Sequence, residues 1–386
     1  PTGVENSGWL INGKKPNTAS APGIVSAEMT WETVRSWNIG FDFGLLNNRL
    51  TGSFDYFVRN TLDMIGPAPQ PATLGATVPK INNADMKAWG FEVEVSWRDR
   101  IKDFNYGVKF VLSDDQRKVT RYPNEELNRN QWYAGRMDGL VWGYETVGIA
   151  KTDAEMEAHL ASLPNGGQSQ LGSKWAAGDI MYKDLNGDGK ISSGDGTLND
   201  LGDLKVVANT QLRFKYGLTV DASWKGFDFS AFFQGVGKRD VVVGGPYFWG
   251  ANGQGMWQAA AFKDHIDYFR PEDTESVFGP NVNAYYPRVI FGGGSSEGGK
   301  NTLTQSRYVQ NGAYIRLKNL QLGYTLPSII TKKFAVNSLR VYVSGDNLWT
   351  GTKMRVFDPE VLGSTSDAGK AYPLARVWSV GLNVNF

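Results

Sequence analysis

The residues whose types and spacing could bind a metal ion lie between positions 184 and 195. Counting from Asp184, side-chain oxygens fall at positions 1, 3, 5, 9 and 12, with glycine at position 6 and a backbone carbonyl at position 7. Hard cations need several oxygens around a tightly wound loop, so this spacing is typical of a calcium loop. The predicted ligands are Asp184, Asn186, Asp188, Lys190 (through its carbonyl), Ser192 and Asp195.

The match to an EF-hand is incomplete, because Asp195 stands where the longer, bidentate glutamate belongs. The sequence also predicts no flanking helices, so the segment is an EF-like loop. We expect it to bind Ca²⁺, with Mg²⁺ as the second choice, in a structural role. The alternative is a series of Asx turns in a solvated loop.

Aromatic side chains between the predicted strands are a second set of candidates. Flat rings stack on sugars or pack against peptides, so they suit a substrate path. The alternatives are packing within loops and an aromatic belt at a membrane interface. The candidates for substrate binding are Trp132, Tyr133, Trp142, Tyr144, Trp249 and Trp257, with Tyr285 and Tyr286.

Catalytic chemistry finds little support in the sequence. There is no cysteine, which excludes disulfides and thiolate metal sites, and the two histidines, His159 and His265, leave little room for a histidine-rich metal site. Residues 294–298 match G-x-S-x-G, but they lie in a glycine-rich run with no predicted helix after it, so we interpret them as a loop. The formal net charge of +1, without a long basic run, gives no indication of nucleic-acid binding. We expect no enzymatic activity.

The elements that position these residues are predicted to be β-strands. Apolar side chains recur with a period of two in 38–44, 50–58, 91–97, 104–112, 212–220, 227–233, 339–343 and 378–386. Short turns at 46–49, 98–102 and 223–226 alternate with long segments at 113–131, 144–204 and 238–306. A phase change predicts a β-bulge near Lys318-Asn319, and an N-cap residue with an acidic first turn predicts a helix over 152–162.

This period fits both an antiparallel sandwich with one wet face and a barrel in lipid. The barrel is favoured because the strands are roughly ten residues long, against about 5–6 in globular proteins. Alternating short and long connections are also typical of outer-membrane barrels. No run of 18 apolar residues exists, which excludes a transmembrane helix, whereas a spanning strand needs only about 9–11 residues.

The predicted strands, ten to twelve of them, are about half of the 22 in the largest plugged barrels. An open sheet would leave unpaired edges in lipid, so another segment or chain must close it. The chain also begins at Pro1 without signal-peptide features, and we interpret it as a piece of a longer precursor. The predicted fold is therefore all-β: the C-terminal half of an antiparallel transmembrane β-barrel of about 22 strands, with 144–204 as a long extracellular loop carrying the cation site.

Short motifs occur in a recognisable order along nearly the whole chain. They are Trp31-Glu32-Thr33, 37–42, 47–52, Asn82-Asn83-Ala84, Gly90-Phe91-Glu92, 178–191, 314–319, 322–327, Asp346-Asn347-Leu348, Asp358-Pro359-Glu360 and 372–386. Through them the chain resembles the SusC/RagA-like TonB-dependent outer-membrane transporters of Bacteroidetes. Each motif alone is weak, and their order and spacing carry the resemblance.

The resemblance implies active import of glycans or peptides across the outer membrane. It implies a SusD-like surface lipoprotein as partner, and TonB acting through an N-terminal plug and TonB box that are not seen in this chain. Phe386, a terminal aromatic, resembles the signal read by barrel-assembly machinery, with an ordinary strand end as the alternative. Two other functions stay open: a structural subunit of a larger outer-membrane complex, and a soluble calcium-dependent carbohydrate-binding β-protein.

Overall fold

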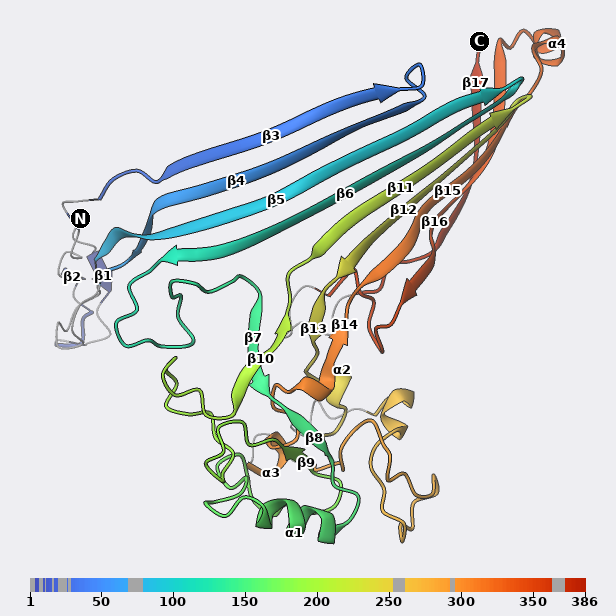
Figure 1. Ribbon diagram of the computed structural model, residues 1–386. Coiled ribbons are helices and arrows are strands. Elements are labelled where there is room, and N and C mark those ends of the chain that lie inside the picture. Colours follow the sequence, from blue (N-terminus) through green and yellow to red (C-terminus); the bar gives the residue numbers. More distant parts are fainter. Residues whose placement is uncertain are drawn as a thin grey trace.

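The computed structural model describes residues 4–6, 10, 12–15, 17–19, 26, 29–68, 79–252, 261–291, 296–362 and 372–386. Within these residues, nine long strands form one antiparallel sheet, and sheet neighbours are also successive long strands of the chain (Figure 1). In spatial order they are β3 (Thr33–Leu45), β4 (Leu50–Pro67), β5 (Lys80–Ile101), β6 (Phe104–Arg121), β11 (Arg213–Trp224), β12 (Phe227–Lys238), β15 (Tyr314–Thr325), β16 (Ser338–Thr352) and β17 (Val377–Asn385).

Shorter elements occupy the connections. The paired short strands are β1 (Val4–Asn6) with β2 (Asn17–Ala19), β7 (Leu140–Tyr144) with β10 (Leu204–Asn209), β8 (Thr146–Ile149) with β9 (Ile180–Tyr182), and β13 (Asp240–Val242) with β14 (Val309–Asn311). The helices are α1 (Asp153–Ala161), α2 (Pro246–Trp249), η2 (Lys263–Ile266), α3 (Ser296–Gly299), η3 (Ser306–Tyr308), α4 (Ser328–Thr331) and η4 (Lys332–Phe334). None of the helices in the described ranges is long and apolar enough to cross a membrane.

The strand register gathers the apolar side chains on one face of the sheet. A single cross-strand row consists of Leu45, Leu50, Trp97, Val108, Val220, Ala231, Leu320, Gly345 and Trp378. The adjacent row on the opposite face is mostly polar, with Thr51, Ser96, Lys109, Thr219, Asn319 and Asp346. Ile39 and Val380 on the apolar face are 58% and 78% exposed. Such an exposed band requires apolar surroundings, as on the lipid side of a barrel wall.

The short turns lie together at one end of the sheet, and the long loops fold at the other end (Figure 1). The predicted turn at 46–49 is confirmed, with Leu46, Asn47 and Asn48 all at positive φ. The β11–β12 turn consists of Lys225 and Gly226, with φ of 43° and 89°. It is tighter than predicted, because strand pairing continues through Trp224 and Phe227.

The predicted turn at 98–102 is wrong in extent, since β5 runs to Ile101. The charged residues at 98–100 suggested a turn, yet Asp99 is paired across the sheet. Arg49 Nη1 lies 3.1 Å from Asp99 Oδ2, and the Arg49 guanidinium lies over the Trp97 ring. The predicted loop at 113–131 also begins too early, because β6 continues to Arg121. Beyond the apolar band both faces of a strand can be polar, so the alternation that predicted the strand disappears.

Two local predictions are confirmed. The register of β15 against β16 shifts between Leu317 and Asn319, which is the predicted bulge. Helix α1 lies inside 152–162, and the Thr152 side chain caps it by accepting a hydrogen bond from Glu155 N. The predicted strand count of ten to twelve exceeds the nine wall strands of the described chain, because the remaining β-segments form short strand pairs outside the wall.

Candidate functional site

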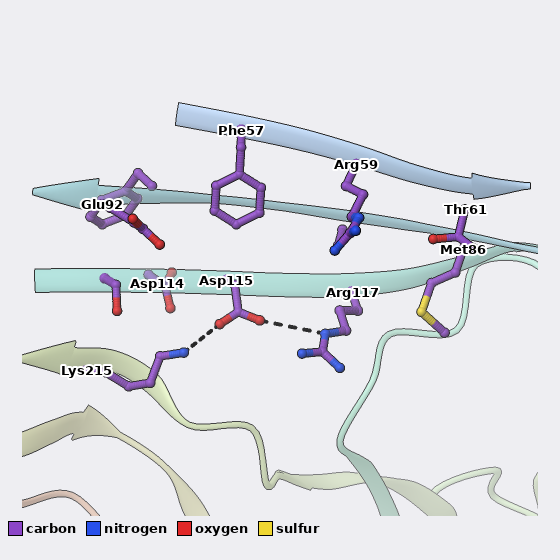
Figure 2. A pocket seen from close by; sticks show the side chains of 12 residues that line it. Phe57, Arg59, Thr61, Met86, Glu92, Asp114, Asp115, Arg117 and Lys215 are labelled. Carbon is purple, nitrogen blue, oxygen red and sulfur yellow. Dashed lines mark hydrogen bonds and ion pairs between the residues drawn. The ribbon is translucent and has the colours of Figure 1, made fainter. Parts of the chain in front are cut away.

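The polar face of the sheet carries a cavity of about 460 Å³ between β4, β5, β6 and β11. Figure 2 shows Lys215, Asp115 and Arg117 in line across it. Lys215 Nζ lies 2.7 Å from Asp115 Oδ1, and Arg117 Nε lies 3.7 Å from Asp115 Oδ2. Phe57 and Arg59 of β4 complete the wall. The polar face of the sheet, called the inner wall below, therefore carries charges of both signs and is open to polar solutes.

One pair of acids on this wall has no neutralising partner. Asp55 and Glu92 lie directly opposite each other on β4 and β5, and neither makes an ion pair within the part of the chain that the structure describes. Like charges in this position repel. The neighbouring Glu94 differs, because it pairs with Lys109 Nζ at 2.7 Å. Glu92, Glu94 and Lys215 thus share the polar face of the sheet.

Two of the motifs that carry the resemblance meet at a second point on the inner wall. Arg316 of β15 is almost fully buried and donates to Asp358 Oδ2 and Glu360 Oε2, each at 2.6 Å. Lys318 Nζ reaches Glu360 Oε1 at 2.9 Å. Arg239 donates to two carbonyls of the same segment, those of Pro359 and Leu362. These contacts fix the segment after β16 against the wall.

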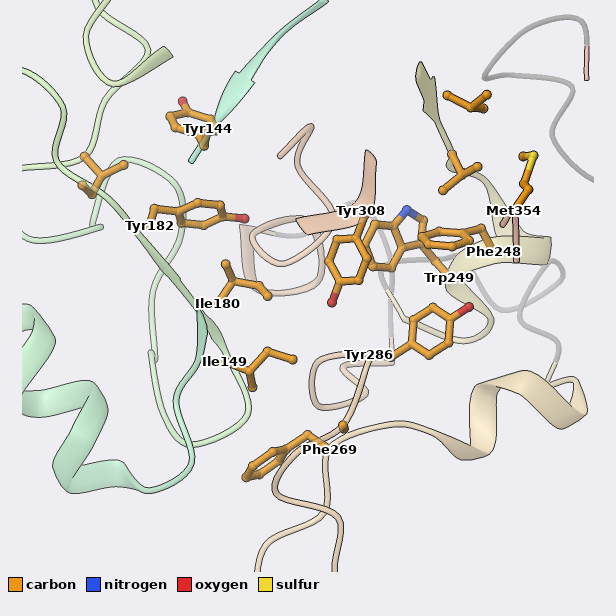
Figure 3. Packing of buried hydrophobic residues seen from close by; sticks show 14 of the residues in the cluster. Tyr144, Ile149, Ile180, Tyr182, Phe248, Trp249, Phe269, Tyr286, Tyr308 and Met354 are labelled. Carbon is orange, nitrogen blue, oxygen red and sulfur yellow. The ribbon is translucent and has the colours of Figure 1, made fainter. Parts of the chain in front are cut away.

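The long loops pack into an assembly with a hydrophobic core of its own. Its buried members include Tyr144, Ile149, Ile180, Tyr182, Phe248, Trp249, Phe269, Tyr286, Tyr308 and Met354 (Figure 3). They come from the β7–β10 segment, from the β12–β15 segment and from the segment after β16. Loops far apart in sequence are therefore held as one folded body at this end of the sheet.

A buried ion network joins the first two of these segments. Asp179 accepts hydrogen bonds from Arg288 at 2.7 and 2.8 Å and from Asn301 Nδ2 at 2.8 Å, and Lys300 Nζ lies 2.9 Å away. Asp179 and Lys300 are both fully buried. Lys300 Nζ also lies 4.6 Å from the centre of the Trp175 ring. The Gly178-Asp179-Ile180 motif thus holds the loops together.

The structure places some of the predicted substrate-binding aromatics in the core of the loop assembly and others outside it. Tyr144 is only 7% exposed and packs against Tyr182 within the core, which favours the packing alternative for that residue. Trp249 is also buried, yet its ring lines a cavity in the loop assembly, as does Tyr286.

The other aromatics lie outside that core. Trp132 is more than a third exposed beside Tyr122, and Tyr133 packs against Arg136. Trp142 is half-buried in β7. Trp257 lies outside the described residues. Substrate contact by these side chains stays a prediction.

The predicted cation loop is wound by Asx turns. Asp184 accepts from Gly187 N at 2.6 Å and Gly189 N at 2.9 Å, and Asn186 accepts from Asp188 N at 3.0 Å. Gly189, at φ 77°, makes the sharp bend that the spacing predicted. Asp195 instead accepts from Thr197 N at 2.7 Å. The described part of the chain brings no three acidic or histidine side chains together in a group that could hold a metal ion.

Sequence reasoning missed Asp203, which stabilises this loop. Its fully buried carboxylate accepts from Leu185 N and Ser192 N, both at 2.7 Å. Burial raises the pKa of Asp203, although the two hydrogen bonds lower it. The carboxylates of Asp184 and Asp188 raise it further. Asp203 lies outside the twelve-residue spacing, so no motif signalled it. Whether the loop binds Ca²⁺ stays a prediction.

Two remaining predictions concern single segments. Phe386 is 84% exposed and follows Val384, which lies on the apolar face, so its position suits the predicted assembly signal. In the G-x-S-x-G match, Gly294 and Ser295 lie outside the described residues. A short helix, α3, begins at Ser296 where no helix was predicted, and Glu297 in it accepts from the Ser173 hydroxyl.

Comparison with known proteins agrees with this architecture. The model of the TonB dependent receptor-like β-barrel family matches residues 1–348. The chain belongs to this family. TonB-dependent receptor P3 of Formosa agariphila is 27% identical over 98% of this chain and 36% of its own length. SusC of Bacteroides thetaiotaomicron is 24% identical over 96% of this chain and 33% of its own length.

A solved structure, that of the RagAB peptide transporter, superposes with a TM-score of 0.71 at 23% identity, over 100% of this chain and 38% of that one. The chain thus spans about a third of the length of the relatives it matches. The SusC/RagA-like resemblance, the antiparallel barrel fold and the outer-membrane location are confirmed. The family consists of receptors and transporters, which also confirms the expectation that the chain is not an enzyme.

Proposed function

We propose that this chain forms the C-terminal wall and much of the extracellular mouth of an outer-membrane importer for glycans or peptides. The observation that carries the proposal is the difference in polarity between the two faces of the sheet. One face presents a continuous apolar row to lipid, and the other presents charged pockets to the interior. A folded loop assembly stands at one end. This is the construction that a wide, gated passage needs.

The partners follow from the relatives. SusC and RagA are similar over most of this chain, and the RagAB structure is described as that of a peptide transporter. A SusD-like lipoprotein on the loop assembly would cover the passage, and TonB would act through segments outside this chain. The exposed apolar band leaves the soluble carbohydrate-binding alternative without support.

The loop at 184–195 would bind Ca²⁺, or in second place Mg²⁺, through Asp184, Asn186, Asp188 and the Lys190 carbonyl. The ion would neutralise the acidic side chains that raise the pKa of Asp203 and would hold the loop in its wound form. Its role is structural, and the transport proposal does not depend on it.

The proposal is tested in the native host. Deleting tonB or the gene for the proposed SusD-like partner lipoprotein should abolish growth on, and uptake of, the cognate oligosaccharide or peptide. A control strain lacking an unrelated TonB-dependent receptor should retain uptake. Unchanged uptake of every candidate substrate would contradict import, and would leave the structural-subunit function as the better account.

A further inference from the structure

A second cavity, of about 440 Å³, lies inside the loop assembly beside α2 and η2. Most of its lining is carbon, from Trp249, Phe262, Ile266, Phe278, Tyr286 and Val289. This volume is in the range of cavities that bind small molecules, and an apolar lining with few polar groups is their usual composition. Phe278 is 55% exposed at its edge, so the cavity is accessible from solvent.

The cavity also contains a buried hydrogen-bond donor without an acceptor. Asn252 is only 3% exposed and is one of the lining residues. Its Oδ1 accepts from Ile290 N at 3.3 Å, which leaves Nδ2 as the donor. That Nδ2 has no hydrogen-bond partner within the described residues. An unsatisfied buried donor costs about 1–3 kcal/mol, so a ligand that supplies an acceptor gains that energy.

The imidazole of His265, which also lines the cavity, already has hydrogen-bond partners. His265 Nδ1 accepts from Phe262 N at 3.0 Å, and Nε2 lies 3.1 Å from the Phe248 carbonyl. The histidine therefore holds the wall in place through backbone contacts, and Asn252 remains as the buried group that can select a ligand.

One wall of the cavity is held rigid by a buried arginine. The Arg270 guanidinium lies over both the Tyr268 and Phe278 rings, at 4.7 and 5.8 Å from their centres. It also donates to the carbonyls of Gly279 at 2.5 Å and Ile266 at 2.6 Å. These two rings are therefore held in place before a ligand arrives, which lowers the entropy lost on binding.

A neighbouring cavity of about 300 Å³ also has Phe262 in its lining, together with Asp358. Asp358 is the partner of Arg316, whose register places it on the polar face of the sheet.

We propose that the 440 Å³ cavity binds an apolar side chain of a peptide, with a neighbouring main-chain carbonyl accepting a hydrogen bond from Asn252 Nδ2. This inference rests on the proposed import function and narrows its substrates to peptides. A sugar ring fits less well, because each buried hydroxyl needs a partner and the lining offers mostly carbon. An apolar side chain needs no such partner, and the peptide carbonyl satisfies the one buried donor.

The test measures peptide binding to the purified full-length protein by equilibrium dialysis. The probes are acetyl-alanyl-phenylalanyl-alaninamide, its glycine analogue without the central side chain, and maltotriose. Phe278→Ala removes apolar wall from the cavity. Asn252→Asp keeps the shape and the acceptor for Ile290 N but replaces the donor. Phe291→Ala is the matched control, because Phe291 is similarly exposed and does not line the cavity.

The phenylalanine peptide should bind at least tenfold more tightly than the glycine peptide or maltotriose. Phe278→Ala should weaken its binding about tenfold and Asn252→Asp about fivefold, whereas Phe291→Ala should leave it unchanged. Heat-modifiable gel mobility checks that each variant is folded. Equal binding of the two peptides, tighter binding of maltotriose, or equal affinity of Phe278→Ala and Phe291→Ala would overturn the proposal.

Uptake by cells separates this inference from the import function on which it rests. Binding of the phenylalanine peptide, together with no TonB-dependent uptake of any candidate peptide or glycan, would contradict import and leave the cavity assignment standing. Uptake that both cavity variants leave unchanged would contradict the cavity assignment and leave import standing.

Discussion

Asp179→Asn should destabilise the loop assembly locally. The substitution keeps the shape of the side chain and removes the charge that faces Arg288 and Lys300. Lys300 is fully buried, so its ammonium would remain in the interior without its closest counter-ion. Removing one partner of a buried pair costs about 3–5 kcal/mol.

The structure places the expected cost at the lower end of that range. Lys300 Nζ keeps hydrogen bonds to the carbonyls of Ser173 at 2.7 Å and Lys174 at 3.0 Å, the face of Trp175, and Glu297 at 3.5 Å. Arg288 is about a third exposed and can be hydrated. We therefore expect a loss of about 3 kcal/mol, which raises the population of the open loop roughly 150-fold.

Amide hydrogen exchange on the full-length protein measures this opening. The Ala150 and Gly178 amides, which hydrogen-bond to the Asp179 and Ala150 carbonyls, should exchange about 150-fold faster in the variant. Amides of β4 and β5 should not change. Asp153→Asn is the control, because Asp153 is exposed and accepts one hydrogen bond, from Ala177 N, that asparagine can also accept. Protection within threefold of the wild type in Asp179→Asn would refute the argument.

Three further predictions concern the cation loop, a turn and the last residue. Saturating Ca²⁺, at about 100 times its Kd, should slow amide hydrogen exchange in 184–203 by about 100-fold. Asp184→Asn should abolish this slowing. No slowing in the wild type would contradict the cation site. Gly226→Ala, at φ 89° with its new Cβ 2.7 Å from the Thr325 carbonyl, should lower stability to urea by about 1–3 kcal/mol. Gly244→Ala, which meets open space, should cost less than half as much, and equal losses would refute the turn argument. Phe386→Ala should lower the yield of outer-membrane protein several-fold, unlike Asn385→Ala, and equal yields would favour an ordinary strand end.

The wall of the barrel could be predicted because its physics is local. Period-two alternation needs only neighbouring residues, and one apolar face per strand fixes the register. The bulge at Lys318-Asn319 was predictable for the same reason, since it restores the phase of the apolar face. The ends of β5 and β6 were not, because Arg98–Arg100 and the polar stretch after Leu112 resemble turns until their cross-strand partners are known.

The loop assembly was beyond sequence reasoning because its contacts join distant segments. Asp179 and Lys300 are separated by more than a hundred residues, among which lie two wall strands, β11 and β12, three short strands and the helices α2, η2 and α3. The burial of Tyr144 depends on such contacts too, and its residue type alone suits a substrate site equally well. Spacing predicted the Asx winding at Asp184, yet Asp203, which stabilises that winding, carries no signal of its own.

The contacts of the motifs shared with SusC/RagA-like transporters indicate which residues are available to select a substrate. Asp179 joins the loops, Asp358 and Glu360 hold Arg316, and Asn82 links the Thr30 backbone to the Asp63 carbonyl. Each makes these hydrogen bonds within the chain, so these four motif residues maintain the architecture of the family. A residue that selects substrate should instead have a polar atom without a partner beside a cavity, and within the loop assembly Asn252 meets this criterion. Exchanging the lining of that cavity between relatives should change which peptides bind, whereas exchanging these four motif residues should change stability alone.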